Sequence, residues 1–590
     1  MLKYTLQNAK QNKLRLLPIR LAPITFLLYT ISVLLSTLLI VVIAYSRQLL
    51  VNYGTKGILQ EFVILIIINL VLMYFSQHGL PTIAALISSK LRNIVIQDTE
   101  KSLIFKKASI PYEYHEAAET NDLFEHLEKP YDFIWDYWQA LILIIGTTLS
   151  IIGMLLYVAQ IGFIFSGILT LILIPIMSVS IKAGNSYYDT WARTAEYRRR
   201  CSDLRNVLSD KKYAQEKLLF GYQTELLSRW ENSYKTVRSD SIKEEIKGAR
   251  KVSSYGVMLC VVFLLLLIYI LHLLRKNQIS PGIAVSLITI FPTFVNQVIF
   301  TLSNQINILS RAQNQMSAYS MILSLPNEEG IFDLPEYRTS FKCIEFRNVS
   351  FRYPGTDNLI LHNLSFKIHE GQHYALVGIN GAGKTTLIKL LLRLYRVTEG
   401  EILIDGKNIN DFSRKEIIGL VSALFQDFAR YPQTVSENIG IGNIHEISNE
   451  QEIIKCAECI DISMRITSLK NGYKTNLSNV LENGVDLSGG EWQKVCIARL
   501  LFSKTAIKIL DEPTAALDPF GEEALFEDFF QLMKDTTTLT ISHRLSSCKY
   551  ADQILVLDHG CIAESGTHQQ LIERDGLYAK MYLSQKEMYH

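Results

Sequence analysis

Long stretches without a charged residue in the first 310 residues restrict the fold of this half of the chain more than any other feature. No Asp, Glu, Lys or Arg occurs between Arg20 and Arg47. Four further stretches of this kind are 62–89, 137–181, 252–274 and 277–310. An apolar segment of about 20 residues crosses a bilayer as a helix, and only helices and closed barrels satisfy their backbone groups there. These lengths predict an all-α transmembrane domain.

Six spans are expected. The stretch 137–181 is too long for one crossing, and Gln160-Ile161-Gly162 interrupts it, so we expect a tight hairpin of two spans. Within residues 1–325 the spans are predicted at 23–46, 62–87, 138–158, 163–181, 253–274 and 279–309. No charged side chain lies inside a span, whereas proton- and ion-coupled carriers place such groups near the middle of the membrane. The energy for any transport is therefore expected to come from elsewhere.

The charges of the loops predict the orientation. Five Lys or Arg residues precede the first span, two lie in each of the loops 47–61 and 275–276, and none lies in the hairpin near residue 160. Because cytoplasmic loops carry the excess of positive charge, the N-terminus is predicted to be cytoplasmic. An even number of spans returns the C-terminal half to the same side. The expected protein is a multi-pass protein of the plasma (cell) membrane.

Two long cytoplasmic connections, 90–136 and 182–251, are charged and rich in helix-forming residues. We expect the second to fifth spans to continue through them as long helices, joined in pairs by short transverse turns at 112–125 and 210–222. A solvated charged linker is the alternative interpretation. Residues 326–340 are polar with two prolines and form the expected linker to a second domain.

Residues 341–590 have the alternating strand and helix pattern of an α/β domain. Within it, Gly378 to Thr386 reads GINGAGKTT, which fits the phosphate-loop pattern between a strand and a helix. Lys384 is expected to reach the β- and γ-phosphates of a nucleotide, and the Thr385 hydroxyl to bind Mg²⁺. A later apolar strand ends in Asp511-Glu512. Asp511 is expected to hold Mg²⁺, and Glu512 to orient or deprotonate the attacking water.

A second glycine-rich segment, Leu487-Ser488-Gly489-Gly490-Glu491, precedes a helix predicted at 492–501. A helix N-terminus binds anions, and one chain has one phosphate loop, so a second γ-phosphate site implies a partner chain. This sequence resembles the signature of the ATP-binding cassette family. Over its whole length the chain resembles a half-size ABC exporter of the six-span type. The expected fold is thus a six-helix transmembrane domain followed by an α/β P-loop ATP-binding cassette.

The resemblance implies roles for further residues. Tyr353 matches the aromatic residue that stacks on adenine, and Gln426 matches the Q-loop glutamine that contacts Mg²⁺ and water. Asp518 matches the D-loop aspartate, and His543 the switch histidine that senses the γ-phosphate. The turns at 112–125 and 210–222 correspond to the coupling helices, which press on the Q-loop region. The catalytic residues implied are Glu512, His543 and Gln426, and the Mg²⁺ ligands are Thr385, Gln426 and Asp511. The nucleotide-binding residues implied are Tyr353, Gly378, Asn380, Gly381, Gly383, Lys384, Thr385, Thr386, Ser488, Gly489, Gly490, Glu491 and Asp518.

By the same resemblance, two chains sandwich two ATP molecules, as a homodimer or with a homologous half-transporter. One residue departs from the family pattern: Lys508 interrupts the apolar strand before Asp511, and a buried lysine is costly unless its ammonium escapes or pairs. Because Asp511 and Glu512 are intact, we interpret Lys508 as an effect at the strand edge and not as a loss of activity.

Other classes of cassette protein fit less well. The six expected spans exclude a soluble cassette ATPase, and importers usually carry membrane and ATPase parts on separate chains. A cassette-gated channel or regulator is an alternative, but Glu512 and His543 favour a pump that hydrolyses ATP. A formal net charge of +2 gives no argument for a nucleic-acid partner.

The substrate is predicted from a subfamily resemblance. The segments 425–428 (FQDF), 431–439 (YPQTVSENI), 483–486 (NGVD) and 491–494 (EWQK) are similar to those of bacterial exporters of lantibiotics and other modified peptides. Many bacteriocin exporters add an N-terminal cysteine peptidase, which is not expected here because no cysteine precedes Cys201. Export of drugs or lipids is the alternative, since uncharged spans suit any amphipathic cargo.

Overall fold

The computed structural model divides the chain into two units, which are described separately. One unit comprises Met1–Ala108 with Ala117–Leu325, and the other Ser109–Glu116 with Pro326–His590. The residues that the structure describes are 14–126, 132–171, 174–175, 178, 190, 193–478, 484–513, 530–534, 536–542 and 545–588.

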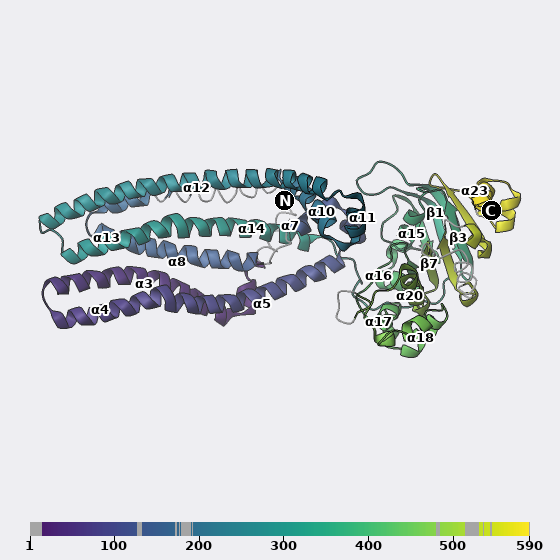
Figure 1. Cartoon of the computed structure of the whole chain (residues 1–590), viewed down its shortest axis with the longest axis horizontal. Coiled ribbons are helices and arrows are strands. Elements are labelled where there is room, and N and C mark those ends of the chain that lie inside the picture. Colours follow the sequence, from purple (N-terminus) through teal and green to yellow (C-terminus); the bar gives the residue numbers. More distant parts are fainter. Residues whose placement is uncertain are drawn as a thin grey trace. The chain divides into compact units, whose positions relative to one another are not determined.

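The first unit consists of long helices that lie side by side (Figure 1). Its longer elements are α3 (Pro23–Thr55), α4 (Leu59–Tyr74), α5 (Leu80–Ser109), α8 (Phe133–Ala159), α10 (Ala195–Ser209), α12 (Gln223–Arg275), α13 (Pro281–Asn296) and α14 (Ser303–Ser324). A short helix α2 (Leu17–Leu21) precedes α3. Two π-helical segments, η1 (Phe75–Gly79) and η3 (Gln297–Leu302), continue directly into α5 and α14.

Small residues let the helices of this unit approach closely, as is usual for helix packing in membranes. A Cβ atom at Gly146 of α8 would lie 2.8 Å from Thr37 Oγ1 of α3, and one at Gly153 would lie 2.8 Å from Val41 Cγ2. Side-chain hydrogen bonds add to this packing. The Tyr157 hydroxyl donates to Gln48 Oε1 at 2.8 Å. These contacts fix α8 against α3 without burying a charge.

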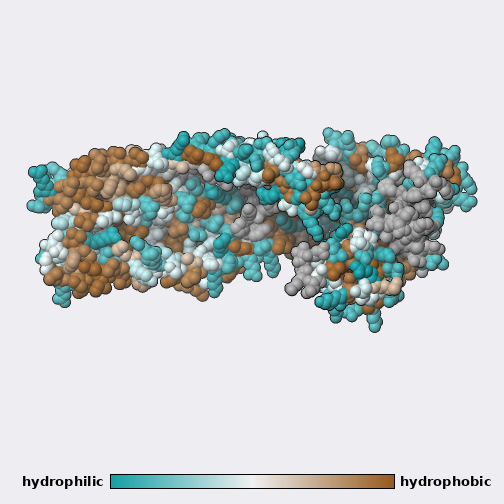
Figure 2. Space-filling model, in the orientation of Figure 1, coloured by the Kyte–Doolittle hydropathy of each residue, from teal (hydrophilic) through white to brown (hydrophobic). Residues whose placement is uncertain are grey.

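Five helices within the described residues are long and apolar enough to cross a membrane: Pro23–Thr55, Leu59–Ser109, Phe133–Ala159, Gln223–Arg275 and Pro281–Ser324. They contain five of the six expected spans. The remaining span, expected at 163–181, is helical over 163–171, and most of its second half lies outside the described residues. Apolar side chains cover the surface of this unit around the α3–α4 and α12–α13 connections (Figure 2). Leu59 and Leu271 there are 75% and 62% exposed, which suits contact with lipid.

The expected continuation of the spans into long helices is confirmed for α5 and for α12, which has 53 residues. Short helices lie where transverse turns were expected. The first turn contains α6 (Tyr112–Glu116) and α7 (Ala118–His126), and the second contains the 3₁₀ turn η2 (Lys211–Tyr213) and α11 (Ala214–Phe220). Helix α6 belongs to the second unit and not to the helical one.

The second unit is an α/β domain with two sheets (Figure 1). An antiparallel sheet has the order β2-β1-β4-β5, and a six-stranded sheet has the order β10-β9-β3-β8-β7-β6, in which β9, β3, β8, β7 and β6 are parallel. The strands are β1 (Cys343–Phe351), β2 (Leu361–His369), β3 (His373–Gly378), β4 (Glu399–Ile404), β5 (Lys407–Asn408), β6 (Val421–Leu424), β7 (Ile507–Asp511), β8 (Thr537–Ile541), β9 (Gln553–Asp558) and β10 (Cys561–Gly566). Runs such as Ile507–Asp511 are buried throughout, as expected for parallel strands covered on both faces.

The helices of this unit are α15 (Lys384–Leu391), α16 (Arg414–Leu420), α17 (Val435–Gly440), α18 (Glu450–Glu458), α19 (Ser463–Thr467), α20 (Gly489–Phe502), α22 (His568–Glu573) and α23 (Leu577–Met588). Three apolar cores lie among them. One joins α15 to the two sheets around Leu376 and Leu387, and a second joins α17, α18 and α20 around Trp492 and Ile453. The third packs α22 and α23 against β3 and β9 around Leu571 and Tyr578. The phosphate loop and the Ser488–Glu491 segment therefore belong to different cores of one domain, and the predicted fold class is confirmed.

Candidate nucleotide site

The phosphate loop lies between β3 and α15, as its pattern requires. Lys384 is buried, and its ammonium donates to the carbonyl oxygens of Gly378 and Ile379 at 2.7 and 3.1 Å. Gly381 and Gly383 adopt φ values of +82° and +104°, which side chains with a Cβ atom rarely tolerate. A Cβ atom at Gly383 would also lie 2.6 Å from Leu361 Cδ2. The loop is thus shaped by its glycines, with the lysine ammonium held against it.

Asp511 and Glu512 lie at the carboxyl end of β7, on the same sheet edge as the loop. Burial, together with the nearby Glu512 charge, raises the pKa of Asp511 to about 6, and Lys384 opposes this shift. Burial lowers the pKa of Lys384, and both carboxylates oppose that shift in turn. The electrostatic interaction between Lys384 and the two carboxylates shows that loop and strand end form one site.

Glu512 adopts an unusual backbone conformation beside this site. Its φ is +51°, a value uncommon for residues other than glycine and often found at functional sites. Its N–H donates to Ile541 O at 3.0 Å, which holds the turn against β8. The Gln426 side-chain amide donates to Glu512 Oε2 at 3.0 Å. The structure therefore brings together two of the predicted catalytic residues, Gln426 and Glu512, and places Asp511 next to them.

The predicted adenine-stacking residue, Tyr353, lies in a cluster of aromatic rings. Its ring centroid is 5.0 Å from that of Phe351 and 5.3 Å from that of Tyr395, in edge-to-face geometry. Its hydroxyl lies 3.0 Å from Thr386 Oγ1 in the first turn of α15. Tyr353 is thus adjacent to the first turn of the phosphate-loop helix.

Glu116 of α6 contacts this aromatic cluster, a contact that no motif in the sequence predicts. It accepts hydrogen bonds from the Tyr112 hydroxyl at 2.7 Å, from Lys389 Nζ at 3.2 Å and from the Tyr395 hydroxyl. Lys389 Nζ also lies 5.6 Å from the Tyr353 ring centroid, within the range of a cation–π contact. One of the two expected turns is therefore tied to the part of the domain that carries Tyr353. Only the carboxylate and aromatic residues of the segment 112–116 hinted at such a contact.

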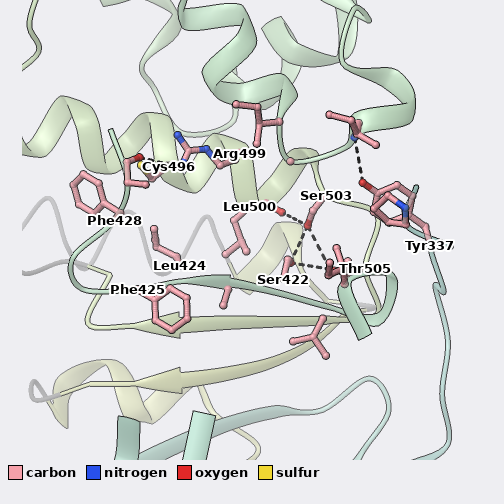
Figure 3. Close-up of a pocket in the computed structure, with 18 of the residues that line it drawn as sticks. Tyr337, Ser422, Leu424, Phe425, Phe428, Cys496, Arg499, Leu500, Ser503 and Thr505 are labelled. Atoms are coloured by element: carbon pink, nitrogen blue, oxygen red, sulfur yellow. Dashed lines mark hydrogen bonds between the residues drawn. The ribbon is translucent and has the colours of Figure 1, made fainter. Parts of the chain in front are cut away.

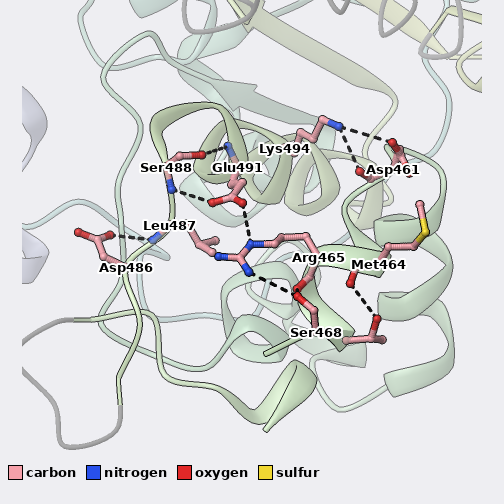
Figure 4. A network of polar contacts seen from close by, with 10 residues as sticks. Asp461, Met464, Arg465, Ser468, Asp486, Leu487, Ser488, Glu491 and Lys494 are labelled. Carbon is pink, nitrogen blue, oxygen red and sulfur yellow. Dashed lines mark hydrogen bonds and ion pairs between the residues drawn. The ribbon is translucent and has the colours of Figure 1, made fainter. Parts of the chain in front are cut away.

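The signature segment caps helix α20 (Figure 4). Ser488 is the N-cap residue: its backbone N–H donates to Glu491 Oε2 at 2.8 Å, and the Glu491 N–H donates to Ser488 Oγ at 3.3 Å. Two-way bonding of this kind is a capping box. The indole of Trp492, in the first turn of α20, donates to Asp486 Oδ1 at 3.0 Å. The Gly489 and Gly490 N–H groups thus begin a well-defined helix N-terminus, the kind of site that binds anions.

Within the described part of the chain, the side-chain hydrogen bonds of Ser488 and Glu491 join them to each other and to Arg465, and none of them reaches the phosphate loop. Predicted residues Asp518 and His543 lie outside the described residues, so their expected roles stay predictions.

Lys508 does not lie at a strand edge, so that interpretation was wrong. β7 lies between β6 and β8, and the Lys508 side chain is buried. Its ammonium donates to Leu500 O at 2.7 Å, Ser503 O at 2.7 Å and Ser503 Oγ at 2.9 Å. These oxygens lie at the C-terminal end of α20, where carbonyl groups lack helical partners. The Lys508 ammonium therefore finds three hydrogen-bond acceptors inside the domain and links β7 to α20.

A cavity of about 600 Å³ lies beside the Q-loop segment (Figure 3). Its lining includes Phe425, Asp427 and Phe428, which flank Gln426 in sequence, and Tyr431 and Arg499. The Arg499 guanidinium lies 4.9 Å from the Tyr431 ring centroid and donates to the carbonyl oxygen of Asn438 at 2.8 Å. The cavity therefore has aromatic side chains in its wall, one of which, Tyr431, packs against the Arg499 guanidinium.

Comparisons with known proteins agree with this geometry. Residues 361–515 match the family described as ABC transporter. The chain is 30% identical over 455 residues to the ATP-dependent lipid A-core flippase of Escherichia coli (strain K12), covering 76% of this chain and 75% of that one. It is 29% identical over 570 residues to the subtilin transport ATP-binding protein SpaT of Bacillus subtilis, covering 94% of this chain and 91% of that protein. A solved structure of a bacterial Atm1-family ABC exporter with ATP bound shares the fold, with a TM-score of 0.79 at 22% identity over 94% of this chain and 97% of that one.

The helical unit with several apolar helices, joined to a domain with a phosphate loop and a signature helix, defines an ATP-driven membrane transporter. The chain belongs to the ABC transporter family and has the organisation of a half-size exporter, in which ATP hydrolysis is coupled to transport.

Proposed function

We propose that two copies of this chain form a dimer in the cytoplasmic membrane and export a peptide, in particular a modified one, by alternating access. The relation to the subtilin transporter carries the substrate assignment, because it spans 94% of this chain and therefore includes the membrane half. The lipid A-core flippase is a relative of similar identity but over 76% of the chain. Lipid or drug export is accordingly the second candidate function, and a cassette-gated regulator the third.

The proposed ATP site is built from both chains. Tyr353 stacks on adenine, the loop Gly378–Thr386 holds the phosphates, and Ser488, Gly489 and Gly490 of the partner copy close over the γ-phosphate. This arrangement is supported by the separation of the two segments into different cores of one domain. A partner that is a homologous half-transporter satisfies the same geometry. The N-terminus and the nucleotide-binding domain face the cytoplasm in this proposal, in agreement with the distribution of Lys and Arg over the loops.

The site suits Mg²⁺, which keeps several waters and takes one or two carboxylates together with phosphate oxygens. Thr385, Gln426 and Asp511 would supply one hydroxyl, one amide and one carboxylate oxygen. Because only one of these donors is a carboxylate, the donor set matches a metal that takes most of its remaining ligands from the nucleotide and from water. When bound, Mg²⁺ neutralises charge that develops on the phosphates.

Glu512 acts next to the γ-phosphate as the residue that orients or deprotonates water. Its hydrogen bond from the Gln426 amide fixes the carboxylate direction. Gln426 itself is flanked by Phe425, Asp427 and Phe428 in the wall of the cavity. A movement of that wall is therefore transmitted to the Glu512 carboxylate through the Gln426 side chain.

The end of helix α11 presents exposed apolar side chains. Leu218, Leu219 and Phe220 at its end are 77%, 78% and 70% exposed, and exposed apolar side chains of this size mark an interaction site. We assign α11 of one copy to the cavity beside Gln426 of the partner. The α6 segment, with Glu116 against Lys389 and Tyr395, makes the second connection. In this proposal the two expected coupling turns connect to different ends of the nucleotide: α6 to the adenine end near Tyr353, and α11 to the phosphate end near Gln426.

The proposal is tested with the purified chain reconstituted in proteoliposomes. Glu512→Gln is expected to abolish ATP turnover while ATP binding and closure of the dimer are retained, because the amide cannot accept the proton of water. Undiminished hydrolysis by this variant would remove Glu512 from its assigned role. ATP-dependent uptake of a labelled modified peptide into inverted vesicles supports peptide export. ATP-dependent lipid translocation without peptide uptake would support lipid export, the second candidate function, instead.

A further inference from the structure

Glu491 places a charge where the fold alone does not need one. The capping box of α20 uses Glu491 to accept the Ser488 N–H, and a glutamine at this position forms the same box without a charge. Although burial works against ionisation, the hydrogen bonds from Ser488 and Arg465 hold the pKa of Glu491 below its ordinary value. The signature segment therefore carries a carboxylate three residues after its N-cap serine.

This carboxylate conflicts with the proposed role of the segment. The N-terminus of α20 must accept the γ-phosphate of an ATP bound by the partner copy, and a phosphate repels a neighbouring negative charge. The Glu491 carboxylate lies 2.8 Å from the Ser488 N of the segment that approaches the phosphate in the proposed closed dimer. An uncompensated Glu491 would weaken closure over ATP.

Arg465 of α19 compensates this charge (Figure 4). Its Nε donates to Glu491 Oε1 at 2.7 Å, while the other carboxylate oxygen accepts from Ser488. The guanidinium is held from its own helix as well: it donates to Ser468 Oγ at 3.4 Å, and the Ser468 hydroxyl donates to Arg465 O at 2.7 Å. Arg465 reaches the signature from a segment 26 residues earlier in sequence.

We propose that Arg465 is a positioning residue of the ATP site: its ion pair with Glu491 neutralises the signature carboxylate and orients the Ser488 N-cap for the partner's γ-phosphate. The inference rests on the proposed two-chain ATP site. In the capping box Ser488 Oγ accepts from the Glu491 N–H, which leaves its own O–H to donate to the phosphate. The Arg465–Glu491 ion pair thus holds Ser488 Oγ in position while the Ser488 hydroxyl hydrogen stays available to the phosphate.

A double-mutant cycle on the full-length reconstituted chain tests this. Arg465→Ala is expected to lower kcat for ATP about tenfold, because the free carboxylate then repels the phosphate, while KM for ATP changes little because the phosphate loop is intact. Arg465→Ala combined with Glu491→Gln is expected to recover kcat to within about twofold of Glu491→Gln alone. Arg465→Lys keeps the charge and is expected to lie near the wild type.

Two readouts separate this effect from loss of structure. Repulsion is screened by salt, so the defect of Arg465→Ala is expected to shrink between about 0.05 M and about 0.5 M ionic strength. A defect that is constant with salt, or one that Glu491→Gln does not relieve, would overturn the inference. Lys494→Ala is the matched control, since Lys494 lies one turn further along α20 and contacts Asp461 O at 3.1 Å instead. An equal loss in this control would also overturn it.

The outcomes for the pair and for the proposed function are distinguishable. If Arg465→Ala hydrolyses ATP at the wild-type rate, the proposed role of Arg465 is overturned, and the proposed function is unaffected. Absence of ATP hydrolysis in the wild-type chain, with intact folding, overturns the proposed function and this inference with it.

Discussion

Replacing Lys508 by methionine tests the least expected feature of the cassette, a buried lysine inside the strand that ends in Asp511. The ammonium donates to three oxygens at the C-terminal end of α20, where carbonyl groups also favour a positive charge. Methionine fills a similar volume without a donor. Lys508→Met therefore removes one titratable group and one link between β7 and α20, and leaves Asp511 and Glu512 in place.

The expected effect follows from proton linkage. Burial lowers the pKa of Lys508 to about 7, from 10.5 in the unfolded chain. Between these values the unfolded chain binds more protons than the folded one, so this group adds stability as pH rises, by about 1.4 kcal/mol per pH unit. The contribution is complete above about pH 10.5 and is lost as pH falls to about 7. From about pH 7 to about pH 9, the wild type should gain about 2 to 3 kcal/mol over Lys508→Met.

Hydrogen exchange of peptides that cover β7 and α20 measures this difference in the full-length protein. Opening free energies are compared at about pH 7, 8 and 9 after correction for the intrinsic exchange rate. Lys504→Met is the matched control, because Lys504 lies near the same end of α20 but is half exposed and pairs with Glu446. Parallel pH profiles for wild type and Lys508→Met would refute the titration of a buried lysine, as would a similar slope change in the control.

Two further predictions concern the nucleotide site and its connection to α6. Burial and the Glu512 charge raise the pKa of Asp511 to about 6, and a protonated Asp511 cannot bind Mg²⁺. The Mg²⁺ concentration that half-saturates ATP hydrolysis should therefore rise about tenfold per pH unit below pH 6. A Mg²⁺ requirement independent of pH would contradict this. Glu116→Gln weakens the contact with Tyr395 and is expected to lower substrate-stimulated over basal ATPase activity about fivefold, a loss of roughly 1 kcal/mol for a partly exposed pair. Glu113→Gln, on the same turn, is the control, and an equal effect in both would make the contact merely structural.

The spans and the phosphate loop were predictable because each depends on a local pattern. An uncharged run of sufficient length has few alternatives to a membrane helix, and the run between Arg20 and Arg47 lies almost entirely in the helix Pro23–Thr55. The loop pattern requires glycine at positive φ, which Gly381 and Gly383 adopt. Two π-helical segments, η1 and η3, were not predicted, because a change of helix type depends on packing against neighbouring helices and leaves no periodicity in the sequence.

Contacts that depend on the tertiary fold could not be predicted. The sequence indicated that Lys508 needs a partner. The oxygens that satisfy it lie only five and eight residues earlier, at the end of α20, but no pattern in the sequence identifies them as its acceptors. Glu116 likewise meets Lys389 and Tyr395 more than 270 residues further along the chain. Each of these residues is ordinary in its local context, so neither motif nor periodicity distinguishes it.

Helix α20 connects the two parts of the cassette that the motifs treat separately. Its N-terminus carries the signature serine, and its C-terminal end is bound by Lys508 of the strand that leads to Asp511. In its first turns, the Gln493 amide donates to the carbonyl oxygen of Pro513, directly after Glu512. A helix of 14 residues is about 21 Å long, and beyond its first two residues, Gly489 and Gly490, α20 contains no proline or glycine at which it would bend. Because it is fixed at both ends, a shift of the strand end on hydrolysis must displace the signature serine as well.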